Sequence, residues 1–114
     1  MPFINTKASV EITEKNEKAL KEKFAQIITN FPGKSEAWLM LNFEQNCRMY
    51  FRGSNEKPSA FIEISLYGSA NPASCDKVTA QITQAVSSEL DIPADRIYVK
   101  YQEIEYWGWN GSNF

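Results

Sequence analysis

Two amphipathic helices, each lying between apolar strands, are the feature that most constrains how this chain can fold. The first apolar stripe consists of Leu20, Phe24, Ile27, Ile28 and Phe31. The second consists of Cys75, Val78, Ile82, Ala85, Val86 and Leu90. Spacings of three and four residues place each set on one face of a helix. A helix with a single apolar face must bury it, so we expect both helices to cover a sheet.

The ends of both helices are marked by capping residues. Thr13 is a plausible N-cap for the first helix, with Glu14 and Glu17 in its first turn, and Pro32-Gly33 should end it. Asn71 followed by Pro72 is a typical start for the second helix, because proline has no N–H to leave unpaired at the first helical position. The sequence therefore predicts two long helices separated by about 40 residues.

Apolar, β-forming segments surround these helices. The expected strands are residues 2–7, 38–43, 48–52, 60–66 and 96–104, with a turn-rich loop at 53–58. The 38–43 segment is apolar enough to be buried on both faces. The aromatic ending, residues 106–114, is too apolar for a free tail.

This order repeats strand, helix, strand twice, and we expect one α+β domain over residues 1–114. Two parallel βαβ units predict a four-stranded sheet with both helices on one face. A chain of 114 residues cannot also cover the other face, so we expect oligomerisation through that open face.

Composition excludes several classes of function. The formal net charge of −2 gives no electrostatic footprint for nucleic acid. No apolar run approaches the roughly 20 residues of a membrane span, and no secretion signal precedes the first strand, so a cytoplasmic protein without membrane contact is the default expectation. Cys47 and Cys75 are too few and too far apart for a disulfide scaffold or a zinc site, and we interpret both as free, buried thiols.

The chain contains no histidine, which removes Ser-His, Cys-His and His-ligated metal mechanisms. Acid–base chemistry near pH 7 then depends on a shifted carboxylate, lysine or tyrosine, or on the amino terminus. A methionine before a small residue is usually removed, which here would give Pro2 a free secondary amine. An α-amino group titrates at about 7.7–8.0, so burial or a nearby cation can leave it unprotonated. Pro2 is therefore a candidate general base.

Four motifs, together with their order and spacing, resemble the macrophage migration inhibitory factor family along essentially the full chain. They are Pro2, Gly33-Lys34 after the first helix, the segment Ile92-Pro93-Ala94-Asp95-Arg96-Ile97-Tyr98, and the ending Trp109-Asn110-Gly111-Ser112-Asn113-Phe114. The resemblance implies the tautomerase fold, a homotrimer with sheets inside and helices outside. It also implies a cofactor-free, metal-free keto–enol tautomerase of phenylpyruvate-like small molecules, with sites at subunit interfaces.

The resemblance also assigns roles to individual residues. Pro2 would be the catalytic base, Lys34 the cation that faces the substrate carboxylate, and Tyr67 a backbone contact. The aromatic pocket would be lined by Trp38, Trp107, Trp109 and Phe114, while Tyr98 and Lys100 would come from the neighbouring subunit. These roles suit the chemistry, because taking a proton from the carbon beside a ketone builds charge on the carbonyl oxygen.

Several residues depart from the family pattern or have structural alternatives. Lys100 stands where the best-known members have asparagine, and a plain surface lysine is the favoured alternative. Tyr67 replaces a small branched residue, which narrows the pocket. The alternative for Lys34 is a solvated lysine after the helix end, and the alternative for Tyr98 is an ordinary aromatic residue of a strand. The tryptophans could instead be core or interface residues. The Cys-x-x-C of some members is absent, so no thiol-oxidoreductase activity is carried over.

Two other functions remain open alongside the phenylpyruvate tautomerase. One is a cytokine-like protein, secreted by a non-classical route, that binds a host cell-surface receptor. The other is a tautomerase of dopachrome-type quinones, which would use the same base in a differently shaped pocket.

Overall fold

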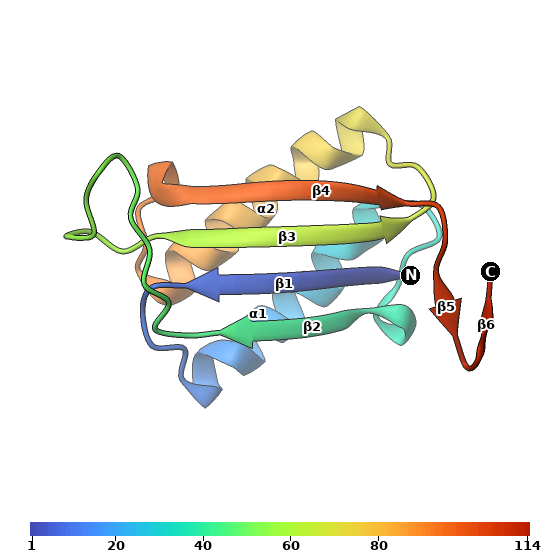
Figure 1. Ribbon diagram of the computed structural model, residues 1–114, viewed down its shortest axis with the longest axis horizontal. Coiled ribbons are helices and arrows are strands. Elements are labelled where there is room, and N and C mark those ends of the chain that lie inside the picture. The colour runs from blue at the N-terminus through green and yellow to red at the C-terminus, as the bar shows by residue number, and fades with distance from the viewer.

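The computed structural model, which describes residues 1–114, has one four-stranded mixed sheet with both helices on one face (Figure 1). The strands are β1 (Pro2–Ala8), β2 (Met40–Glu44), β3 (Ala60–Tyr67) and β4 (Ile97–Ile104), in the order β2-β1-β3-β4. The helices are α1 (Glu14–Ile27) and α2 (Pro72–Leu90). β1 runs parallel to β2 and β3 parallel to β4, and β1 and β3 join the halves antiparallel. The predicted α+β fold is confirmed.

Short elements connect and extend this framework. They are the 3₁₀ helices η1 (Ile28–Asn30), η2 (Glu36–Trp38) and η3 (Ala94–Arg96), and the terminal hairpin of β5 (Gly108–Trp109) and β6 (Ser112–Asn113). The hairpin forms its own two-stranded sheet at the end of the molecule where β1 begins (Figure 1). No helix in the structure is both long enough and apolar enough to cross a membrane.

Both predicted helix caps are present. The Asn16 N–H donates to Thr13 Oγ1 at 3.1 Å, and the Thr13 N–H donates to Asn16 Oδ1 at 3.3 Å, which forms a reciprocal capping box. At α2, Asn71 Oδ1 accepts from the N–H groups of Ala73 and Ser74. Each cap satisfies helix N–H groups that have no partner within the helix.

The core lies between the sheet and the two helices. Both predicted stripes face it, and every stripe residue is buried except Cys75, which is half-buried. The sheet contributes alternate residues, among them Ile4, Ile62 and Ile64, because successive side chains of a strand point to opposite faces. Burying one such side chain contributes about 1.5–3 kcal/mol, so this layer holds the helices on the sheet.

The strand predicted at residues 48–52 is wrong. This segment is irregular and makes only one isolated bridge, between Phe51 and Ser54. Positive φ angles at Arg52 and Gly53 turn the backbone sharply. The carbonyls of Phe51 and Ser54 accept hydrogen bonds from the Arg96 guanidinium, so a distant side chain satisfies groups that a strand partner would otherwise bind.

Two details of the 38–43 strand also need correction. Trp38 ends the 3₁₀ helix η2, and the strand begins only at Met40. β2 is an edge strand, and Met40, Asn42 and Glu44 are exposed, so one of its faces is uncovered in this chain. The segment resembled a fully buried strand because its apolar residues face both the core and the open side of the sheet.

Thr6 gives a stability prediction. Its side chain is fully buried on β1, and its hydroxyl has no hydrogen-bond partner. Thr6→Val exchanges that hydroxyl for a methyl group of similar shape, so the free energy of unfolding should rise by about 1 kcal/mol. Urea denaturation measures the change, with Thr83→Val, at a partly exposed position on α2, as the control. A lower stability for Thr6→Val would show that the hydroxyl is satisfied in solution.

Candidate active site

A cavity of about 580 Å³ opens at the end of the sheet where β1 begins, next to the terminal hairpin. Its lining is mostly apolar. The residues are Met1, Pro2, Phe3, Ala37, Trp38, Leu39, Met40, Ser65, Ile104, Trp107, Gly108 and Trp109. Four predicted site residues, Pro2, Trp38, Trp107 and Trp109, are therefore brought to one cavity.

Strand register explains why these segments meet. Phe3 on the central strand β1 lies opposite Met40 on β2 and Ser65 on β3. Pro2 pairs with Leu66 and is buried, so β1 holds the N-terminal residues inside the fold. The amino terminus is thus fixed by sheet hydrogen bonding rather than left as a loose end.

An aromatic cluster forms one wall. The rings of Trp38 and Trp109 meet edge to face at 4.9 Å between centroids, and Phe114 lies 6.5 Å from Trp38 and 5.6 Å from Tyr67. Edge-to-face contacts of this kind add about 0.5–1.5 kcal/mol beyond burial. Because the hairpin pairs with no strand of the main sheet, these rings attach it to the body.

Lys34 lies beside the cavity, held by the backbone of β3. Gly33, at φ +78°, reverses the chain after the first helix and brings Lys34 toward the sheet. The Lys34 ammonium donates to the Tyr67 carbonyl at 3.1 Å. A cation is therefore fixed at the end of β3 that lies next to Pro2.

The amine of Met1 has a lowered pKa. Burial, followed by the charge of Lys34, lowers the pKa of the Met1 amine below its ordinary value of about 8.0. The Met1 carbonyl accepts from the Tyr67 N–H at 3.1 Å. With Met1 in place the Pro2 nitrogen is an amide, and an amide is not a base.

Tyr98 and Lys100 lie elsewhere. They are near the start of β4, where Tyr98 pairs with Phe61 and Lys100 with Glu63, whereas Pro2 lies at the opposite end of the sheet. Neither residue reaches the cavity of its own chain. This placement agrees with their expected origin in a neighbouring subunit, which stays a prediction.

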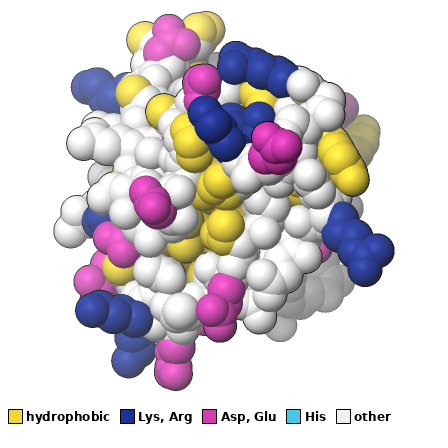
Figure 2. All heavy atoms as spheres, turned by 90° about the vertical axis from the view of Figure 1, so that its left-hand side faces the viewer, with side chains coloured by type: hydrophobic (Ala, Val, Ile, Leu, Met, Phe, Trp, Pro, Cys, Tyr) yellow, Lys and Arg dark blue, Asp and Glu magenta, His cyan; other side chains and the backbone are white.

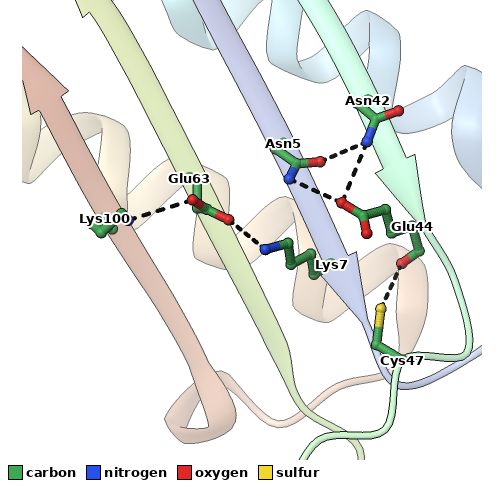
Figure 3. A network of polar contacts seen from close by, with 7 residues as sticks. All are labelled: Asn5, Lys7, Asn42, Glu44, Cys47, Glu63 and Lys100. Carbon is green, nitrogen blue, oxygen red and sulfur yellow. Dashed lines mark hydrogen bonds and ion pairs between the residues drawn. The ribbon is translucent and has the colours of Figure 1, made fainter. Parts of the chain in front are cut away.

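Lys100 belongs to a polar network across the open face of the sheet (Figure 3). Its ammonium lies 3.4 Å from Glu63, which also pairs with Lys7 at 2.9 Å. Both lysines lower the pKa of the Glu63 carboxyl, Lys7 more than Lys100. Within this chain Lys100 is an exposed lysine paired with Glu63, and its role in a neighbouring site stays a prediction.

Several residues that line the cavity, chiefly Phe3, Met40 and Ser65, were not predicted from the sequence. They alternate with core residues, and Phe3 and Ser65 point to the open side of the sheet. The period-two pattern indicated two faces, but only the register between strands shows that these three lie side by side.

Comparisons with known proteins agree with this geometry. The structure of Leishmania major MIF2 is 33% identical, with a TM-score of 0.93, covering 100% of this chain and 97% of that one. A macrophage migration inhibitory factor homologue from Prochlorococcus marinus is 30% identical, with a TM-score of 0.84, covering 98% of both chains. A Brugia malayi homologue of macrophage migration inhibitory factor is 26% identical over 98 residues, 84% of each chain.

The family profile described as macrophage migration inhibitory factor (MIF) matches residues 1–114. The match spans both strand-helix-strand halves and the terminal hairpin. From the profile, the relatives and the shared architecture, we conclude that this chain belongs to the macrophage migration inhibitory factor family and has its tautomerase-superfamily fold.

Proposed function

We propose that the protein is a cofactor-free keto–enol tautomerase of phenylpyruvate-like substrates, with Pro2 as the general base once Met1 is removed. The observation that carries this proposal is a partly buried amino terminus beside the Lys34 cation, next to the buried Pro2 and at the edge of an apolar cavity. Surroundings that lower the pKa of the Met1 amine would also favour the unprotonated form of a Pro2 amine released at the same place, and the unprotonated form is the one that acts as a base.

The reaction moves one proton from carbon to oxygen. Pro2 takes the proton from the carbon next to the ketone while negative charge develops on the carbonyl oxygen, and protonated Pro2 then gives that proton to the oxygen, which frees the amine again. Ketonisation of an enol is the same transfer in reverse, from oxygen to carbon, and it also begins with the unprotonated amine. Lys34 attracts the substrate carboxylate and disfavours protonation of the nearby amine. The aromatic wall around Trp38 and Trp109 excludes water and accepts an aryl ring, which strengthens both effects.

Removal of Met1 also frees a hydrogen-bond donor. The Tyr67 N–H donates to the Met1 carbonyl, and that carbonyl leaves with Met1. The freed N–H lies close to the Lys34 ammonium, which binds the carbonyl of the same residue. An N–H donor and a cation together suit a carboxylate, so processing would prepare both the base and the anion contact.

The proposed site is completed by a neighbouring subunit in a homotrimer. The cavity is open to solvent, and the uncovered face of the sheet carries Phe3, Met40 and Phe61 beside its polar network. Tyr98 is 57% exposed at the far end of the sheet, where a neighbour can be reached. Tyr98 and Lys100 are proposed to enter the adjacent subunit's cavity.

The test is ketonisation of phenylpyruvate enol by protein whose intact mass shows that Met1 is absent. We expect a rate well above that of buffer, and a much lower kcat/KM for the methyl ester, which lacks the charge that Lys34 would bind. Heat-unfolded protein is the control for catalysis by general amines. Folded, fully processed protein that is no faster than buffer would reject the proposal.

A further inference from the structure

We propose that Phe51 is a positioning residue, whose ring, held in an arginine-anchored loop, fixes the orientation of Tyr98 for the neighbouring subunit's site. The inference rests on the proposed function, because it uses Tyr98 as a site residue. Its starting point is the irregular loop 45–59, which lies at the opposite end of the sheet from Pro2 (Figure 1).

Arg96 anchors this loop from within. It is 93% buried, yet it forms no ion pair, and the guanidinium instead donates to uncharged acceptors on the loop and at its end. These acceptors are the Pro58 carbonyl at 3.0 Å, Ser59 Oγ at 3.1 Å, the Phe51 carbonyl at 3.2 Å and the Ser54 carbonyl at 2.9 Å. Because a buried guanidinium is costly unless its donors are used, the loop is strongly constrained.

Arginine side chains restrain the ring of Phe51 in addition to its backbone. The guanidinium carbon of Arg96 lies 5.3 Å from the ring centroid and that of Arg52 lies 5.0 Å away. Arg52 is itself paired with Asp95 at 3.3 Å. Two cation–π contacts therefore restrain one ring, and both are within the usual range of about 6 Å.

Phe51 transmits this restraint to Tyr98. The two rings meet edge to face, with centroids 5.1 Å apart and an interplanar angle of 81°. Tyr98 also meets Phe61 edge to face, with ring centroids 6.3 Å apart. The Tyr98 hydroxyl makes no hydrogen bond within the chain, so ring packing alone orients this exposed side chain.

Phe51 and Tyr98 lie at the surface of the molecule and not in its core. Figure 2 shows this end of the molecule, with hydrophobic side chains gathered near its middle and charged side chains around them. Tyr50, next to Phe51, is 72% exposed and has no aromatic partner. It therefore provides a matched control for changes to Phe51.

The test compares kcat and KM for enol ketonisation in three variants. Phe51→Leu removes the ring but keeps the carbonyl that Arg96 binds, Phe51→Tyr keeps the ring, and Tyr50→Leu alters the exposed neighbour. We expect Phe51→Leu to lower kcat/KM about 3- to 10-fold, the equivalent of one aromatic pair, mostly through kcat. Phe51→Tyr and Tyr50→Leu should stay near the wild type, and native mass should show the same assembly for all.

A Tyr98→Leu background separates positioning from a general effect on the fold. If Phe51 acts through Tyr98, Phe51→Leu should cause no further loss once Tyr98 is leucine. An unchanged kcat/KM in Phe51→Leu, or an equal loss in both backgrounds, would overturn the inference while leaving an active wild type and the proposed function intact. An inactive wild type would instead overturn the proposed function, and this inference with it.

Discussion

Inserting one alanine between Met1 and Pro2 should lower kcat/KM for enol ketonisation by about 10²- to 10⁴-fold, the usual contribution of a positioned base. Alanine is small enough for Met1 still to be removed, and the Pro2 nitrogen then stays an amide. The structure shows that a residue before Pro2 fits, because Met1 occupies that place and its carbonyl accepts from the Tyr67 N–H. The fold should therefore survive the insertion.

Two controls accompany the insertion. Thermal unfolding should show a Tm close to that of the processed wild type, so that lost activity is not lost structure. Pro2→Gly keeps an amine at the same position but loses the ring that fixes the backbone, so its activity should lie between those of wild type and insertion. Full activity in the inserted protein would mean that the Pro2 nitrogen is not the base.

Lys34→Met should lower kcat/KM about 10- to 100-fold for substrates that carry a carboxylate, the usual effect of losing a charged hydrogen bond. It should also shift the pH profile. The Lys34 charge contributes to the lowered pKa of the amine, so its removal raises that pKa. Since only the unprotonated amine acts as a base, the rise of kcat/KM with pH should move to higher pH.

Burial is the larger cause of the lowered pKa and is still present in the variant, so the profile should shift only part of the way toward an ordinary amine. Lys15→Met is the matched control, because Lys15 is exposed in the first turn of α1, which follows the end of β1 opposite to Pro2. This control variant should change neither kcat/KM nor the midpoint of its pH profile. A profile that stays in place in Lys34→Met would contradict the proposed role of its charge.

The fold could be predicted because its determinants are local and repeated. Helical stripes of buried residues such as Phe24 and Val86, with caps at Thr13 and Asn71, fix two helices without knowledge of distant contacts. The loop around Phe51 could not be predicted in the same way. Its backbone carbonyls bind Arg96, more than 40 residues away, and no local pattern shows such a bond.

Site residues that belong to a sequence motif could be predicted, whereas those that reach the cavity only through the register between strands could not. Pro2, Lys34 and Trp109 were identified from an ordered set of motifs, and the structure brings them to one end of the sheet. The contribution of Met40 and Ser65 depends on which residues of β1 they face. The Tyr67 backbone makes two bonds at the same end, accepting from the Lys34 side chain and donating to the Met1 carbonyl, and both depend on which distant segments meet there.

The most direct test is a ¹⁵N NMR titration of Pro2 in processed protein with ¹⁵N-labelled proline. We expect a secondary amine whose pKa is lowered from the ordinary value of about 8.0 by the same surroundings that act on the Met1 amine, with a titration midpoint that coincides with that of the kcat/KM profile. A Pro2 nitrogen that titrates above 8.0, or that remains an amide in protein that is nevertheless active, would contradict the assignment of Pro2 as the base.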